Sequence, residues 1–465
     1  MVLFKRLVVV VCVGCVCFSC KSTPPKGPPV KSDFVERLAR MLEKNDFAGA
    51  LGLFDQLSPE EAGLPRNLIL KSSVLISAGE PQLARGILEP LIQQYPANMD
   101  ARYTLSVVEG AQKKLRQQRT ILEDIVKEAP AYVPALNDLG RISIENQKNL
   151  NKAAAYYESA LKADPADEDA LIGRARVWRL EKNYDEALGT LSKAIGYHPK
   201  SAMLYSERGR LYRNRGALDE ALSDLDAAVK LDPSDYWFSY DRGLVLLDKN
   251  RKKDALDEFR RAVRINPDNF ISYVYTAGIS DELGLDVEAE QQYKKLAAIK
   301  PDYYFGFEGI GVHSLKRGEW LAAKDAFVKA WQYAPQEVNY ALLAAYAWLK
   351  AAKNSPESRA GVKKLMNDAM KQVKRDSTEY FVLRMYAEGM GDADIARRAE
   401  KENNELMKAR AYFYLACYYD VHNLPALSEK FSEEFKAFNR RDVIEYRINE
   451  FLHTGGSNIA AGNTP

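Results

Sequence analysis

The sequence predicts an all-α protein, arranged as a right-handed solenoid of about ten or eleven helix pairs. The first observation is a series of prolines at intervals of 34 or 35 residues: Pro96, Pro130, Pro165, Pro199, Pro233, Pro267, Pro301 and Pro335. The second is the helical spacing of small and bulky residues between these prolines, which indicates two helices in each interval. A period of this length is typical of a solenoid, whose units bury their apolar faces against one another.

The stretch SERGRLYRNRGALDEALSDLDAAVKLDPSD, residues 206–235, shows how one unit is built. Gly216 interrupts the helical pattern, which predicts a turn between a first and a second helix. Pro233 lacks an amide hydrogen and disfavours the α conformation of Asp232, so it ends the second helix. Small side chains at Gly209 and Ala228 allow the two helices to approach closely. Each interval therefore reads as one helical hairpin.

The unit resembles the tetratricopeptide repeat. The matching positions of this unit are Tyr205, Gly209, Tyr212, Ala221, Leu225, Ala228 and Pro233. The unit ending at Pro335 offers the same pattern in Phe307, Ile310, Gly311, Ala323, Phe327 and Ala330. The resemblance implies 34-residue antiparallel helix pairs whose first helices line a concave groove for a protein or peptide partner.

The repeat pattern weakens toward both ends of the array. We assign residues 33–372 to the array and residues 373–452 to a degenerate helical repeat with a cap, because end units of a solenoid have one face in water. Residues 453–465, HTGGSNIAAGNTP, are predicted to form a disordered tail.

The amino terminus reads as a targeting segment. A basic pair, Lys5 and Arg6, precedes an apolar run of about a dozen residues, shorter than the ~20 that a spanning helix needs. Residues 1–19 are therefore predicted to be a signal peptide. The Ser19-Cys20 step resembles the processing site of a bacterial lipoprotein, which implies acylation of Cys20 and a membrane anchor. Residues 20–32 then form a Pro-rich tether.

Two alternatives remain open at this terminus. The lipoprotein pattern usually has Leu three residues before the acylated cysteine, where this chain has Cys17. Cys15, which follows Gly14, is a rival acylation site. An ordinary secretory signal with incidental cysteines is the other reading.

Charge and motifs exclude several classes of function. The chain has 66 basic and 64 acidic residues, and removal of Lys5 and Arg6 with the signal peptide leaves 64 of each. This balance gives no electrostatic footprint for nucleic acid. The four histidines have no metal-ligand spacing, and no nucleophile elbow, P-loop or HExxH motif occurs. We expect no enzyme activity, no cofactor and no metal.

The resemblance implies which side chains face the groove. Arginines recur at one groove position in three consecutive units, as Arg141, Arg176 and Arg210, and at another as Arg179 and Arg213. The next units place apolar and aromatic residues there: Trp237, Tyr240, Ile271, Val274 and Phe305. Arginines bind carboxylates bidentately, and apolar surface receives a hydrophobic anchor. The alternative is that the arginines pair with neighbouring acidic residues and that the aromatic side chains belong to the core.

These observations predict a membrane-tethered interaction scaffold in the bacterial envelope, which faces the periplasm from the outer rather than the inner membrane. A second hypothesis is a subunit of an outer-membrane protein or secretin assembly machine. A third is an adaptor that brings an enzyme to the cell wall.

Overall fold

The computed structural model describes residues 32–146 and 148–452, and these residues form helices and no strand. The prediction of an all-α solenoid of helix pairs is confirmed. The signal peptide, Cys20 and the tail fall outside the described residues, as does the tether apart from Ser32, which begins the first described helix. Within the described ranges, no helix has the length and apolar character needed to cross a membrane.

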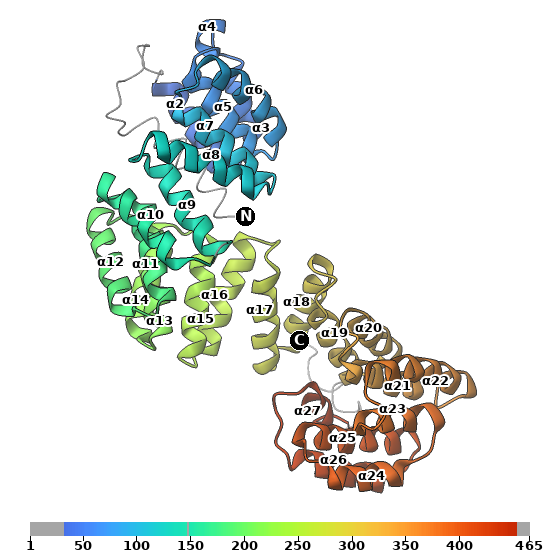
Figure 1. Ribbon diagram of the computed structural model, residues 1–465. Coiled ribbons are helices and arrows are strands. Elements are labelled where there is room, and N and C mark those ends of the chain that lie inside the picture. The colour runs from blue at the N-terminus through green and yellow to red at the C-terminus, as the bar shows by residue number, and fades with distance from the viewer. Residues whose placement is uncertain (1–31, 147, 453–465) are drawn as a thin grey trace, which may run out of the picture. The chain divides into compact units, whose positions relative to one another are not determined.

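The chain divides into two compact units, Met1–Leu231 and Asp232–Pro465. Unit 1 begins with α2 (Ser32–Glu43), α3 (Phe47–Phe54) and a short α4 (Pro59–Ala62). Its further pairs lie side by side (Figure 1). They are α5 (Pro65–Ser77) with α6 (Pro81–Gln94), α7 (Met99–Ala111) with α8 (Leu115–Glu128), α9 (Val133–Glu145) with α10 (Leu150–Ala163), α11 (Glu168–Leu180) with α12 (Tyr184–Tyr197), and α13 (Ala202–Asn214) with α14 (Leu218–Leu231).

Unit 2 continues the same arrangement of paired helices. Its pairs are α15 (Tyr236–Asp248) with α16 (Lys252–Ile265), α17 (Phe270–Glu282) with α18 (Asp286–Ile299), α19 (Phe305–Lys316) with α20 (Trp320–Tyr333), α21 (Val338–Ala351) with α22 (Pro356–Ala369), α23 (Thr378–Glu388) with α24 (Asp392–Lys401), and α25 (Glu405–Val421) with α26 (Pro425–Lys436). A 3₁₀ turn η1 (Met370–Gln372) follows α22, and α27 (Ile444–Asn449) ends the described helices.

Local chemistry fixes several helix ends. In some repeats the residue two positions after the proline caps the next first helix: Asn98, Asp167 and Ser201 each accept a hydrogen bond from a backbone amide of that helix. The turn inside each pair needs a left-handed residue, which recurs with the repeat period. These residues are Gly79, Lys113, Lys148, Lys182, Gly216, Asn250, Gly284 and Gly318.

Aromatic rings pack against glycines of the first helices. A Cβ atom on Gly173 would lie 2.2 Å from the ring of Tyr157, and one on Gly140 would lie 2.7 Å from the same ring. Tyr157, on α10, therefore spans the glycine of its own pair and that of the next pair. In unit 2, a Cβ on Gly309 would lie 2.3 Å from the ring of Tyr293. These close approaches explain why the repeat has glycine there.

One pair in the described part of the chain was not singled out in the sequence. The additional pair is α23 with α24, within the segment predicted to be a degenerate repeat. These helices have only 11 and 10 residues, and no proline closes the second. Gly389 and Gly391, both left-handed, form the turn between them. Because no proline closes this pair, the sequence does not mark it as a repeat of the 34-residue period.

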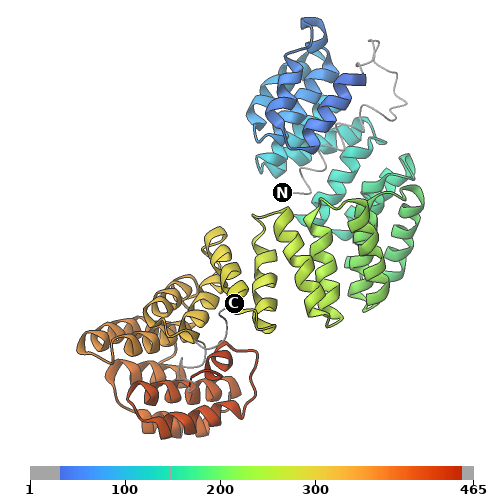
Figure 2. The same cartoon turned by 180° about the vertical axis from the view of Figure 1, so that it is seen from behind.

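The last described helix, α27, packs within unit 2 against α19, α25 and α26. It is the red helix beside α25 and α26 in Figure 1, and the view from behind in Figure 2 places it on the same helices. Ile448 is fully buried, and Asn449 accepts a hydrogen bond from Ser432 of α26 at 2.9 Å. The capping helix predicted after the last pair is therefore present, and it contacts first helices far away in the sequence.

Candidate partner-binding surfaces

The three arginines of the predicted column lie on consecutive first helices of unit 1, α9, α11 and α13. Arg141 pairs with Asp138 at 2.7 Å and with Glu145 at 3.3 Å. The other oxygen of Glu145 lies 3.3 Å from Arg176, so one glutamate joins the first two arginines. The structure thus brings Arg141 and Arg176 together, as an ion-pair network with acidic neighbours.

Arg210 lies on the third of these helices, α13. Its guanidinium pairs with Glu207 of the same helix at 3.0 Å. Exposure rises along the column, because the side chains of Arg141, Arg176 and Arg210 are 26%, 39% and 52% exposed. The two other predicted groove arginines, Arg179 and Arg213, lie in the last turns of α11 and α13 and are half-buried. Carboxylates thus neutralise the charges of Arg141, Arg176 and Arg210, while the exposure of these side chains increases from α9 to α13.

The predicted apolar positions of unit 2 are half-buried and are engaged in ring packing. Trp237 packs edge-on against Tyr240 at 5.5 Å between centroids, and Tyr240 lies 5.6 Å from both Phe259 and Tyr275. Phe305 packs edge-on against Tyr293 at 5.5 Å. Ile271 and Val274 lie on α17, also half-buried. These side chains contribute to packing between helices and keep part of their surface exposed.

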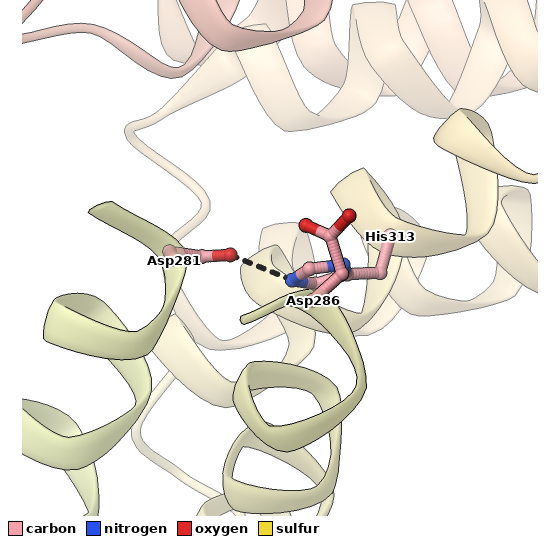
Figure 3. A group of neighbouring side chains, drawn as sticks. All are labelled: Asp281, Asp286 and His313. Atoms are coloured by element: carbon pink, nitrogen blue, oxygen red, sulfur yellow. Dashed lines mark hydrogen bonds and ion pairs between the residues drawn. The ribbon is translucent and has the colours of Figure 1, made fainter. Parts of the chain in front are cut away.

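A group of ionisable side chains that the sequence analysis did not connect lies between α17, α18 and α19. Asp281, Asp286 and His313 bring their ligand atoms within 4.8 Å of one another, a geometry that could hold a metal ion (Figure 3). His313 is buried, and its Nε2 lies 2.8 Å from Asp281 Oδ1, which accepts the hydrogen bond. The residues are five and 32 positions apart, so only the stacking of repeats brings them together.

The cations of the protein already pair with both carboxylates of this group. Arg447 of α27 contacts Asp281 Oδ2 at 2.6 Å, and Lys316 contacts Asp286 at 2.6 Å. Tyr293 donates a further hydrogen bond to Asp281 at 2.6 Å. Burial alone would raise the pKa of Asp281, but the hydrogen bond from His313 and the charge of Arg447 hold that pKa below its usual value. A divalent cation would have to displace two ammonium or guanidinium groups, so the arrangement favours a structural ion-pair network over a metal site.

Comparison with known proteins agrees with the repeat architecture. The family model described as ETO1 C-terminal domain matches residues 120–303. No curated protein matches the chain.

Several solved structures are similar to parts of the chain. YrrB, described as a TPR protein with an unusual peptide-binding site, is 22% identical with a TM-score of 0.35, and the match covers 42% of this chain and 98% of YrrB. For pilF of Pseudomonas aeruginosa the identity is 20%, the TM-score 0.40 and the coverage 45% of this chain and 94% of pilF. For a tetratricopeptide repeat protein from Parabacteroides merdae the identity is 18%, the TM-score 0.40 and the coverage 52% of this chain and 96% of that protein. With its proline period of 34 or 35 residues and its paired helices, the chain has the fold of a tetratricopeptide-repeat array, and the family match lies across the middle of these repeats.

Proposed function

We propose that this protein is a lipid-anchored tetratricopeptide-repeat scaffold of the bacterial envelope, which faces the periplasm and binds a protein partner. The observation that carries the proposal is the order of features in the sequence: a basic pair, a short apolar run, Ser19-Cys20, a Pro-rich spacer and then the repeats. Acyl chains on Cys20 would hold the protein at the membrane, since each buried methylene contributes ~0.8 kcal/mol. An extended spacer of this length, at ~3.1 Å per residue, would hold the repeats tens of ångströms from the bilayer.

The anchoring prediction is tested at Cys20. Cys20→Ser is expected to abolish labelling by radioactive palmitate, and to leave the protein in the soluble fraction or as an uncleaved precursor. Cys15→Ser is the matched control and should keep both the label and the membrane fractionation. Loss of label in Cys15→Ser with full label in Cys20→Ser would instead assign the anchor to Cys15. Full label in both variants, or no label in the native chain, would contradict the proposal.

The partner contact is proposed to include the exposed end of the arginine column in unit 1. Arg176 and Arg210 are the more accessible arginines, and their pairing with Glu145 and Glu207 shows that carboxylates fit beside them. An acidic segment of a partner would exchange these weak exposed ion pairs for desolvated ones, which are stronger. The identity of that partner separates the general scaffold from the two specialised hypotheses. Copurification with β-barrel proteins or secretins would favour the assembly machine, and copurification with wall hydrolases would favour the adaptor.

Arginine truncation tests this contact with the copurified partner. Arg176→Ala and Arg210→Ala are each expected to weaken binding by ~1.5–3 kcal/mol and to lower its salt sensitivity, because a charge-assisted hydrogen bond is lost. Each variant should lose only ~0–1 kcal/mol of folding stability, because its own ion pair is exposed. Lys193→Ala, on the second helix α12, is the control. Equal binding by all three variants in a titration at two salt concentrations would contradict the proposed contact.

A further inference from the structure

Unit 2 contains a hollow that the sequence analysis did not foresee. It lies among three first helices, α21, α23 and α25, and its empty volume with the open mouth included is ≈ 290 Å³. Apolar side chains form much of the wall: Val338, Leu342, Val382, Met407 and Ala411. The polar lining comes from Asn339, Thr378, Glu379, Arg410 and Tyr414. The enclosed part is small and the mouth is open, so the tip of one side chain could enter, whereas a whole small molecule could not.

Two buried polar atoms of residues that line this hollow make no hydrogen bond, the donor Arg410 Nε and the acceptor Asn339 Oδ1. Asn339 is only 4% exposed, and its Oδ1 atom is buried without a hydrogen bond. A buried acceptor without a hydrogen bond destabilises the folded state, so a donor that enters the hollow would recover that free energy. The backbone carbonyl of Asn339 is occupied, because Tyr414 donates to it at 3.1 Å. The orphaned acceptor is therefore the side-chain oxygen alone.

The hollow is lined by one charge of each sign, Arg410 and Glu379. Arg410 forms its ion pair with the fully buried Glu445 of α27, which does not line the hollow, at 3.0 Å. Glu379 is half-buried and, among the described residues, has no hydrogen bond or ion pair. Burial raises the pKa of the Glu379 carboxyl, and the more distant charge of Arg410 opposes that rise only in part. Glu337, at the start of α21, adds a further carboxylate to this neighbourhood.

The same unit shows how such carboxylates are satisfied nearby. Arg447 of α27 reaches Asp281 on α17 at 2.6 Å, and its charge also acts on Glu308 of α19. Carboxylates on these first helices therefore already bind one basic side chain from another part of the chain. The hollow between α21, α23 and α25 has the Glu379 carboxylate and an amide acceptor, while the Arg410 guanidinium that also lines it makes its ion pair with Glu445.

We propose that this hollow is a recognition pocket for a lysine or arginine side chain of the partner protein. The aliphatic stem would lie against Val338, Leu342 and Val382. The cationic head would donate to Asn339 Oδ1 and to the Glu379 carboxylate. This pocket would be a second contact with the partner, and it rests on the proposed function, which assumes such a partner. The pocket binds a cation, whereas the arginines in unit 1 bind carboxylates.

The test uses small probes and a reporter inside the pocket. The full chain is labelled with ¹³C-methyl methionine, so that the methyl group of Met407, which lines the hollow, reports occupancy. The buried Met366 on α22 is the internal reference. Nα-acetyl-lysine amide is titrated beside its norleucine and glutamate analogues. One side chain should bind in the millimolar range, because so few contacts offset the cost of association.

The expected result is a saturable shift of the Met407 signal with the lysine probe, without a matching shift of Met366. Glu379→Gln is expected to weaken this binding about tenfold, because a charge-assisted hydrogen bond is lost. Glu388→Gln is the matched control, since Glu388 lies exposed on the same helix and pairs with Arg384. Glu379→Gln is isosteric, so it should fold as the native chain does.

Three results would overturn the proposal. The first is that the norleucine probe binds more tightly than the lysine probe. The second is that the glutamate probe does so, which would assign Arg410 as an anion site, and the third is that Glu379→Gln binds lysine as well as the native chain does. These measurements are independent of acylation and of partner recovery. A lipidated chain that binds its partner but not the lysine probe would leave the proposed function intact and remove only the pocket. Lysine binding by a chain that is not acylated would support the pocket and contradict the proposed lipid anchor.

Discussion

Glu445→Ala is expected to cause the largest loss of stability among single replacements in unit 2, about 3–5 kcal/mol. Glu445 is fully buried on α27. Its Oε1 atom accepts a hydrogen bond from Tyr414 at 3.1 Å and lies 3.0 Å from Arg410 Nε. The alanine variant would leave the largely buried guanidinium of Arg410 without its carboxylate. A charge stranded in this way costs far more than the intact pair contributes.

The measurement is chemical denaturation followed by circular dichroism. Glu445→Gln should lose less stability than Glu445→Ala, because its amide oxygen still accepts the hydrogen bond from Tyr414. Glu450→Ala, just beyond α27 and exposed, is the control and should stay within ~0.5 kcal/mol of the native chain. A loss below ~1 kcal/mol in Glu445→Ala would show that Arg410 finds water or another acceptor when α27 no longer supplies one.

The second large effect is expected in unit 1, where Gly173→Ala should destabilise the fold by ~1–3 kcal/mol. The added Cβ would lie 2.2 Å from the ring of Tyr157, far inside van der Waals contact. That ring is buried and also lies close to Gly140, so it has little room to move away from an added methyl group. Either the ring or the helix α11 must shift.

Gly189→Ala is the matched control for this experiment. Gly189 lies on the exposed face of α12, and a Cβ there would meet nothing within 4 Å. Alanine should therefore stabilise the helix by ~0.5–1 kcal/mol. Tyr157→Leu in the Gly173→Ala background should recover part of the loss, which a double-mutant cycle measures. Additive effects of the two replacements, or equal melting temperatures for Gly173→Ala and Gly189→Ala, would contradict the steric explanation.

Local signals in the sequence predict most of the fold. The prolines end the second helices, and the regularity of their spacing alone implies the pairs between them. The position of the left-handed turn residue is harder to predict, because Lys113, Lys148 and Lys182 stand there where other repeats have glycine. The backbone geometry there is imposed by the packing of the two helices, which overrides the preference of lysine.

The candidate sites were harder to predict than the fold, apart from contacts within one helix. The acidic partners of Arg141 were visible, since Asp138 and Glu145 stand three residues before it and four after it on one helix face. The pocket was not visible, because its middle helix α23 belongs to the pair without a closing proline. Contacts such as Arg447 with Asp281, 166 residues apart, depend on how α27 returns to earlier helices, and no local pattern encodes that return.

The position of Tyr157 across two glycines limits how this protein can be rearranged by recombination. A repeat is usually treated as a module that evolution or an engineer can delete, duplicate or exchange. Here the ring of one module fills a notch in the next, so a crossover between α10 and α11 would set Tyr157 against a foreign residue at the place of Gly173. The same holds between α18 and α19, where Tyr293 meets Gly309. The unit of inheritance is accordingly a block that carries each bridging ring together with the glycine of the next pair that it meets.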